Sequence, residues 1–241
     1  MRKPLTALLV CSIASVATAA DPVFIDTFDD NNIGPWWTVH TVGQPTVSEV
    51  NARLEAAFPA NSTGSLFSAD VTTVKWLVGD FDTQVDFALL NWPAHNGVRV
   101  GLIASPLTTG PGAGIERVSR IPGECGGAED YCTDIAGQVA WVATDDLAGT
   151  LRLVRTGSTV SGYYLDSENW VLVGSEPWTD GDTHLALAGW SHDSVFRNQD
   201  VLFAFDDFQI NSGNLVPEPA SAVILLAGLG AVLRRRKRLN Q

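Results

Sequence analysis

The stretch 150–166, TLRLVRTGSTVSGYYLD, decides the fold class of this 241-residue chain. Leu151 and Leu153 alternate with Arg152, which is the two-residue period of a strand with one buried face. The extended pattern resumes after residues 156–158, TGS, whose central glycine is typical of a turn. We therefore expect an antiparallel hairpin here.

The same pattern extends outwards over residues 21–213, where short β-type runs are separated by Gly, Pro, Asn, Asp and Ser. In residues 98–102, VRVGL, Val98 and Val100 face one way and Arg99 the other. No segment of this region has the periodicity of a helix, and no repeat or linker divides it. Many short strands with regular turns predict one all-β domain, an antiparallel sandwich or barrel.

Three pieces carry a resemblance to a known fold: FIDTFDD (24–30), LRLVRTGSTVSGYYLDSENWVLVGS (151–175) and VLFAFDDFQI (201–210). Their order resembles the concanavalin A-like jelly roll of legume lectins, laminin G-like modules and many glucanases, over residues 23–212. The resemblance implies a jelly-roll β-sandwich whose first and last strands are neighbours.

The two ends of the chain differ from this domain. Residues 1–20 combine an early Arg-Lys pair, a short apolar run and small residues, as in a secretory signal peptide with a short helix. Residues 214–241 hold a Pro-Glu-Pro, an uncharged run that predicts a hydrophobic helix, and a basic end. The uncharged run, 220–233, is short for a transmembrane helix but can serve as a membrane anchor.

The stretch 216–238, VPEPASAVILLAGLGAVLRRRKR, resembles the PEP-CTERM sorting signal. The matching residues are Pro217, Glu218, Pro219, Arg234, Arg235 and Arg236. The resemblance implies a Gram-negative bacterium that makes exopolysaccharide. It also implies export across the inner membrane, removal of the leader by signal peptidase, and processing of a membrane-anchored precursor by an exosortase. The mature protein then reaches the cell surface or the extracellular matrix. The alternative is an ordinary C-terminal anchor that is never cut.

The net charge of the domain limits the classes of partner that it can bind. Residues 21–216 contain eight Lys and Arg against 26 Asp and Glu, a net charge of −18. Such a surface repels phosphate backbones, which argues against nucleic acid. The excess of carboxylates either favours a structural Ca²⁺ ion or serves solubility alone.

The predicted calcium ligands join the two ends of the domain: Asp26, Asp29, Asp30, Asp206 and Asp207. They meet if the first and last strands are neighbours, as the resemblance implies. The alternative is that residues 29–32, DDNN, form a plain turn and that the last two aspartates lie on opposite faces of a strand.

Two cysteines remain after the leader, Cys125 and Cys132, in the Gly-rich acidic loop GECGGAEDYC (123–132). In an exported protein a close pair predicts a local disulfide. Metal binding is the alternative, although no second Cys or His pair stands nearby.

Catalytic patterns are weak in this chain. The glucanases of glycoside hydrolase family 16 carry Glu-x-Asp-x-x-Glu on one strand, and this string does not occur here. Asp82 and Asp86 share a strand face, but no Glu joins them. No nucleophile-elbow string and no closely spaced His pair is present.

Aromatic residues instead suggest sugar binding, because indole rings stack on the apolar faces of sugars. Of the eight tryptophans, those in NWPAHNGVR (91–99) and GWSHDS (189–194) stand beside polar side chains. The candidate sugar ligands are Trp92, His95, Arg99, Trp190 and His192. We expect an exported protein that binds extracellular polysaccharide rather than an enzyme. The alternatives are a polysaccharide-active hydrolase or lyase with another active site, and a purely structural matrix protein.

Overall fold

The computed structural model describes residues 21–60, 66–106, 110–119, 129–178, 181–192, 196 and 198–217. Every regular element in these ranges is a strand, which confirms the all-β prediction. None of the described residues forms a helix long and apolar enough to cross a membrane. The two predicted terminal helices, within 1–20 and 218–241, lie outside the described residues.

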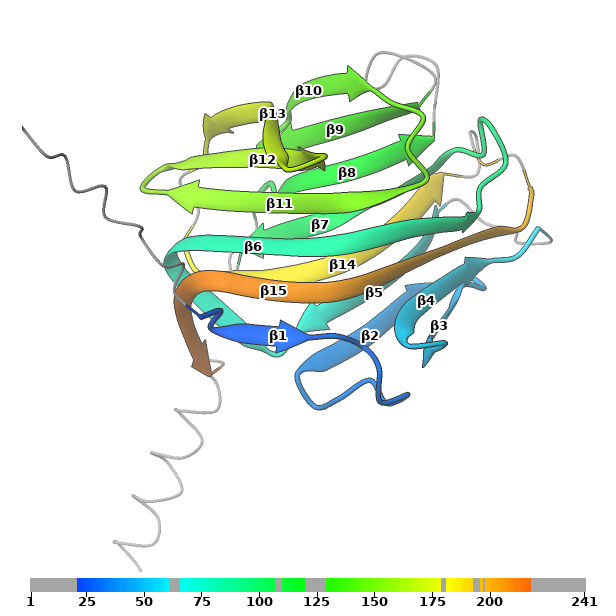
Figure 1. Cartoon of the computed structure of the whole chain (residues 1–241), viewed down its shortest axis with the longest axis horizontal. Coiled ribbons are helices and arrows are strands. Elements are labelled where there is room, and N and C mark those ends of the chain that lie inside the picture. Colours follow the sequence, from blue (N-terminus) through cyan, green and yellow to red (C-terminus); the bar gives the residue numbers. More distant parts are fainter. Residues whose placement is uncertain are drawn as a thin grey trace, which may run out of the picture.

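The strands form two antiparallel layers packed face to face (Figure 1). We call the layer that begins at β10 the first sheet. In spatial order it contains β10 (Gln138–Ala143), β9 (Glu129–Ile135), β8 (Ala113–Ser119), β7 (Val98–Pro106), β14 (Thr183–His192), β5 (Leu66–Thr73) and β2 (Trp37–Val42).

The second sheet contains β13 (Asn169–Pro177), β12 (Thr159–Asp166), β11 (Ala148–Thr156), β6 (Lys75–Asn91) and β15 (Val201–Pro217). The far edge of β15 pairs with β4 (Arg53–Phe58) and then with β1 (Phe24–Asp26), and β3 (Thr46–Val50) pairs with β4. A bridge between Thr183 and Leu77 joins the two sheets.

Alternation along each strand builds the core between the sheets. In β6, Phe81, Val85 and Phe87 are buried, whereas Asp82 and Gln84 lie on the outer face. The predicted division of β7 is confirmed as well, since its valines are fully buried. Because side chains on successive residues point to opposite faces, most strands contribute to the core and to one outer surface, whereas β10 has no buried residue.

The hairpin predicted at 150–166 is confirmed: β11 and β12 pair across the turn at 157–158. The first and last strands of the domain are neighbours, with Phe24 opposite Ile210. Strand β15 continues four residues beyond the expected domain end at 213, and Pro217 pairs with Lys75.

The sequence interpretation missed several strands, namely β2, β3, β5, β8 and β9. The cysteine loop expected at 123–132 is in part a strand, because β9 begins at Glu129. In β8 the alternation is concealed, since Arg117 and Ser119 are polar and yet buried on the inner face. A strand whose buried face contains polar residues with internal hydrogen-bond partners cannot be predicted from hydrophobic periodicity alone.

Candidate functional site

The outer face of the first sheet is hollowed along its middle. Two adjoining hollows, of about 360 and 460 Å³, share Trp190 and Ile103. Their floor is made of small residues: Gly114, Ala186 and Ala188. Because the central strands carry these small residues, the middle of the face lies lower than the larger side chains around it.

The antiparallel register aligns side chains across the strands on this face. We call the row through the middle of the sheet the central row. It contains Trp141, Cys132, Glu116, Gly101, Ala188, Asp70 and His40, one from each of the seven strands. The row thus brings together residues far apart in the sequence, such as His40 and Ala188, which are 148 positions apart.

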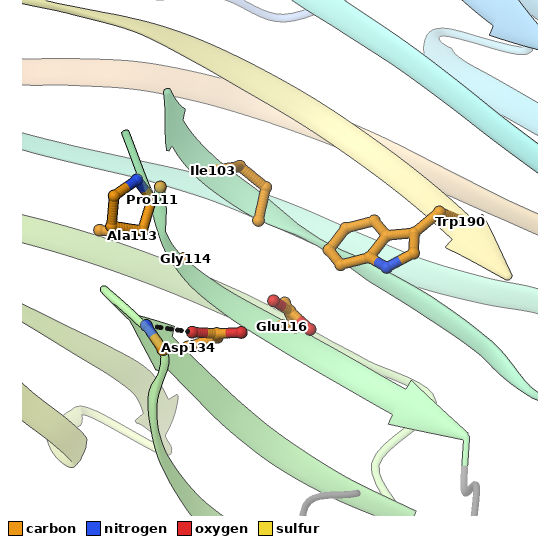
Figure 2. Close-up of a pocket in the computed structure, with 9 residues that line it drawn as sticks. Ile103, Pro111, Ala113, Gly114, Glu116, Asp134 and Trp190 are labelled. Carbon is orange, nitrogen blue, oxygen red and sulfur yellow. Dashed lines mark hydrogen bonds between the residues drawn. The ribbon is translucent and has the colours of Figure 1, made fainter. Parts of the chain in front are cut away.

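Trp190 stands beside an ion pair. It lies opposite Arg99 in the register, and the guanidinium carbon is 5.3 Å from the centre of its ring. Arg99 Nε donates a hydrogen bond of 2.6 Å to Glu116 Oε2, and the Glu116 side chain is only 3% exposed. Figure 2 shows Glu116 lying between Trp190 and Asp134. The buried pair therefore fixes the guanidinium against the indole.

Gly101 is what allows Glu116 to lie flat on the sheet. A Cβ atom at this position would approach Glu116 Cγ to 2.7 Å and the Ile115 carbonyl oxygen to 2.5 Å. The carboxylate can reach Arg99 because this space is left open.

Two further carboxylates border the hollows. Asp134 Oδ1 accepts a hydrogen bond of 3.0 Å from the backbone N–H of Gly137 (Figure 2). Asp70 Oδ2 accepts one of 3.1 Å from Ser68 Oγ. Burial raises the pKa of Asp70, while the Ser68 hydrogen bond and the facing His40 act in the opposite direction. A carboxylate has about four acceptor positions, so both groups have capacity for ligand hydroxyls.

The cations of the described residues are all engaged. Four form ion pairs with carboxylates, one lies over Trp36, and one donates to the Gly157 and Gly181 carbonyls. The four in ion pairs are Arg53, Arg99, Arg117 and Arg152. Lys75 is the cation over Trp36, and Arg155 is the one that donates to the two carbonyls. Within the described ranges, therefore, the hollows have acceptors in excess and no uncommitted cation, which suits a ligand without negative charge.

The structure separates the predicted sugar ligands. Arg99 and Trp190 come together on the outer face. Trp92 instead donates a 3.0 Å hydrogen bond from Nε1 to Glu129 Oε2 and packs against the core. His95 is exposed in a turn with a φ of 57°. His192 ends β14, and its side chain lies outside the described part.

Sequence reasoning did not single out Glu116, Asp134, Asp70 or His184, which also line the hollows. Each is an isolated polar residue within a strand, so no local motif marks it. The signal that can find them is the strand register, which places them on one face.

Three of the five predicted calcium ligands at the β1–β15 edge, Asp26, Asp30 and Asp206, already accept hydrogen bonds. Asp26 Oδ2 accepts from Trp37 Nε1 at 2.7 Å, and Asp206 Oδ1 accepts from the Asp207 backbone N–H at 2.8 Å. Burial and neighbouring carboxylates raise the pKa of Asp206. No group of three His, Cys, Asp or Glu among the described residues is arranged to hold a metal ion. The calcium site stays a prediction.

Two other predicted features reach the border of the described part. Cys132 is disulfide-bonded, and its predicted partner Cys125 lies outside the described residues. Pro217 ends β15, whereas Glu218, Pro219 and the arginines at 234–236 also lie outside.

No family model and no curated protein matches the sequence. Solved structures do share the fold. A prokaryotic β-1,3-1,4-glucanase (lichenase) from a mouse hindgut metagenome superposes with a TM-score of 0.55 at 10% identity, covering 78% of this chain and 97% of its own. A lectin from Bauhinia forficata in complex with GalNAc has a TM-score of 0.55 at 10% identity, covering 79% and 99%.

A GH43 protein from Bacillus licheniformis has a TM-score of 0.52 at 13% identity and covers 77% of this chain. The match spans only 38% of that protein's length. At such identities the likeness establishes the architecture, and the chain is a jelly-roll β-sandwich like the lichenase and the lectin.

Proposed function

We propose that the hollow outer face of the first sheet binds uncharged glycans, with Trp190 as the ring on which a sugar stacks. The observation that carries the proposal is the position of Trp190 at the meeting of both hollows, held by the Arg99–Glu116 pair. Indole rings pack on the C–H face of a sugar, and the carboxylates of Asp70 and Asp134 accept hydrogen bonds from its hydroxyls.

Two kinds of fold neighbour support this class of ligand. The Bauhinia forficata protein is a lectin in complex with GalNAc, and the metagenomic protein is a β-1,3-1,4-glucanase. The first is in complex with a sugar and the second is named for a glucan, and both share the fold of this chain. The identities of 10% carry no residue-level correspondence, so the proposal rests on the geometry of this chain.

The preference for uncharged glycans follows from electrostatics. The domain carries a net charge of −18 over residues 21–216, and its described cations already have partners. A uronate or sulfate chain would be repelled by the surface and would meet no uncommitted cation in the described hollows.

Binding to a glycan panel tests the proposal. We expect the protein to bind neutral polysaccharides and to leave uronate-rich and sulfated ones unbound. Trp190→Ala is expected to weaken the best interaction about tenfold, equivalent to ~1.4 kcal/mol. Trp170→Ala is the matched control, because Trp170 is also partly exposed beside an arginine, but lies on the second sheet. Equal loss in both variants would contradict the assignment of the site.

A second candidate, hydrolysis, is favoured by one observation. Glu116 lies opposite Cys132, so Asp134 is its diagonal neighbour. The Cα atoms of diagonal residues are about 7–8 Å apart, so the two side chains start close enough to compare with inverting glycosidases, whose carboxyl groups are about 6.5–9.5 Å apart. However, Glu116 is committed to Arg99 and nearly enclosed, which leaves it poorly placed to protonate a leaving group.

Release of reducing ends from the bound polysaccharide decides between the two candidates. Hydrolysis predicts release that Glu116→Gln and Asp134→Asn each abolish. Binding alone predicts no release from the wild-type protein.

We also propose that the domain is exported and sorted by its C-terminal signal, with signal peptidase and an exosortase as its processing partners. The support is the sequence of residues 216–238, with its Pro-Glu-Pro motif, uncharged run and basic end. Replacing Arg234, Arg235 and Arg236 by alanine is expected to accumulate unprocessed precursor on an immunoblot of cell fractions. A processed fraction equal to wild type would contradict sorting by this signal.

A further inference from the structure

Trp141 is a large aromatic residue left half in solvent. Its side chain is 49% exposed, and Val139, which is 50% exposed, lies two residues away on the same face of β10. Strand β10 is the edge of the first sheet. Trp141 does not belong to the proposed stacking site at Trp190, and it does not pack in the core. Neither of these roles therefore explains why this residue is exposed.

The register places Trp141 on the face that carries the hollows. It lies opposite Cys132, which lies opposite Glu116, and Glu116 lies opposite Gly101 in the central row. The neighbouring row through Val139 contains Asp134 and Gly114, both of which line the first hollow. Cys132 is fully buried, so the link from the hollow to the edge strand runs through the neighbouring row, from Asp134 to the exposed Val139 beside Trp141.

The distance between the two rings sets the size of the ligand. Strands β14 and β10 are separated by four strand spacings, roughly 19 Å at about 4.8 Å each. A single sugar ring cannot contact both. A chain of several sugar rings laid across the strands can reach from Trp190 to Trp141 without leaving the face.

The surface between the rings favours a sugar chain over a protein partner. It contains Glu116, Arg99 and Asp134, which are polar and charged, with small residues beneath. Protein interfaces concentrate their apolar area in one central patch, with a polar rim. Two separated aromatic rings joined by hydrogen-bonding groups instead match a polymer whose units each present an apolar face and hydroxyls.

We propose that Trp141 is a second stacking platform, and that the site takes a linear, uncharged polysaccharide laid across the strands of the first sheet. This inference rests on the proposed glycan-binding function and specifies its ligand. Cys132, which is disulfide-bonded and fully buried, lies opposite Trp141 in the register.

Calorimetric titration with oligosaccharides of increasing length tests the proposal, using oligomers of the polymer that binds best in the panel. The affinity of the wild-type protein is expected to rise with length until the chain reaches both rings. Trp141→Ala is expected to weaken binding of the long oligomers about tenfold and to leave the shortest ones unchanged. Trp141→Tyr keeps an aromatic ring and is expected to retain most of the affinity.

Leu172→Ala is the control variant. Leu172 is 50% exposed, as Trp141 is, but it belongs to β13 of the second sheet. It is expected to bind every oligomer as the wild type does, and thermal melts of all variants check that they fold.

Unchanged long-chain affinity in Trp141→Ala, or a loss that is the same at every length, overturns the inference. If short oligomers bind and Trp190→Ala abolishes that binding while Trp141→Ala has no effect, the second platform fails and the proposed function stands. If no glycan binds the wild-type protein, both fail together.

Discussion

The two outer faces of the sandwich carry the same combination of groups in different settings. On the first sheet Arg99 pairs with Glu116 and lies 5.3 Å from the ring centre of Trp190. On the second sheet Arg152 pairs with Asp82 and lies 5.0 Å from that of Trp170. The two faces differ in the residues that surround each ion pair. An arginine, a carboxylate and a tryptophan therefore do not make a binding site by themselves.

The second sheet fills its outer face with polar contacts. Asn211 Nδ2 donates to Asp82 and to Gln84, at 3.2 and 3.0 Å, and Thr150 Oγ1 donates to Asp86 at 2.6 Å. The first sheet instead places glycine and alanine beside its ion pair. These small residues leave a hollow bordered by the carboxylates of Asp70 and Asp134, which can accept further hydrogen bonds. Small residues in the central strands are what distinguish the candidate site from ordinary surface.

The largest expected effect compares the two ion pairs. Arg99→Met leaves the Glu116 carboxylate, 3% exposed, without its guanidinium, and breaking a buried pair costs roughly 3 kcal/mol or more. Arg152→Met affects a more exposed pair, with Asp82 at 17%, and is expected to cost about 1 kcal/mol or less. Urea unfolding of both variants measures the difference, and equal losses would mean that the two faces are equally solvated.

Filling the hollow tests its role in binding. Ala188 lies on the floor and is 3% exposed, so Ala188→Leu places its larger side chain in the hollow. We expect about tenfold weaker glycan binding, or ~1.4 kcal/mol, and a thermal melt checks that the variant is folded. Ala88→Leu on the outer face of β6 is the control and is expected to bind normally. Normal binding by Ala188→Leu would show that the ligand does not enter the hollow.

A smaller effect concerns carboxylates on each face. Burial raises the pKa of Asp70 on the first sheet and of Asp86 on the second. A raised carboxyl pKa means that the folded state holds the proton more tightly than the unfolded chain. The contribution to stability is therefore complete below the unfolded pKa of about 4 and is lost as pH rises through the folded value.

Asp70→Asn and Asp86→Asn should accordingly be slightly more stable than wild type at pH 7. The gain in free energy of unfolding is about 1 kcal/mol or less after solvent screening, and it raises the melting temperature slightly. The advantage should vanish below about pH 4, where the wild-type carboxyls are neutral. Only Asp70→Asn is expected to weaken glycan binding as well. Thermal melts from pH 3 to pH 8 check the first point, and an advantage that grows on acidification would contradict the assigned direction.

The smallest effect tests the predicted calcium site. If the carboxylates at the β1–β15 edge hold Ca²⁺, EGTA lowers the melting temperature and calcium restores it, since an ion bound only by the folded state stabilises it. Asp206→Asn should then remove the response. A midpoint that is identical with and without EGTA would eliminate the calcium site from the account.

The sequence predicted what depends on local pattern. Alternation located the hairpin at 150–166 and the buried valines of β7, and the resemblance implied that the first and last strands are neighbours. The motif NWPAHNGVR was interpreted as one cluster, but its ends belong to different places: Trp92 packs on the core and Arg99 lies on the outer face.

The candidate site could be predicted only in part. Trp190 and Arg99 were identified because tryptophan is conspicuous and stands beside polar residues. Glu116, Asp134 and Asp70 were not, because each comes from a different strand and only the pairing register brings them to one face. Long-range register is a property of the whole sheet and leaves no mark in a short window of sequence.

The most direct test of the binding face uses the eight tryptophans as reporters. Each indole N–H gives one resonance in a ¹⁵N-labelled sample, and these residues are distributed over the core and both outer faces. Titration with a neutral oligosaccharide is predicted to shift the Trp190 and Trp141 resonances and to leave those of Trp92, Trp170 and Trp178 in place. Shifts at Trp92 or Trp170 with Trp190 unmoved would contradict the account, because the glycan would then bind elsewhere on the sandwich.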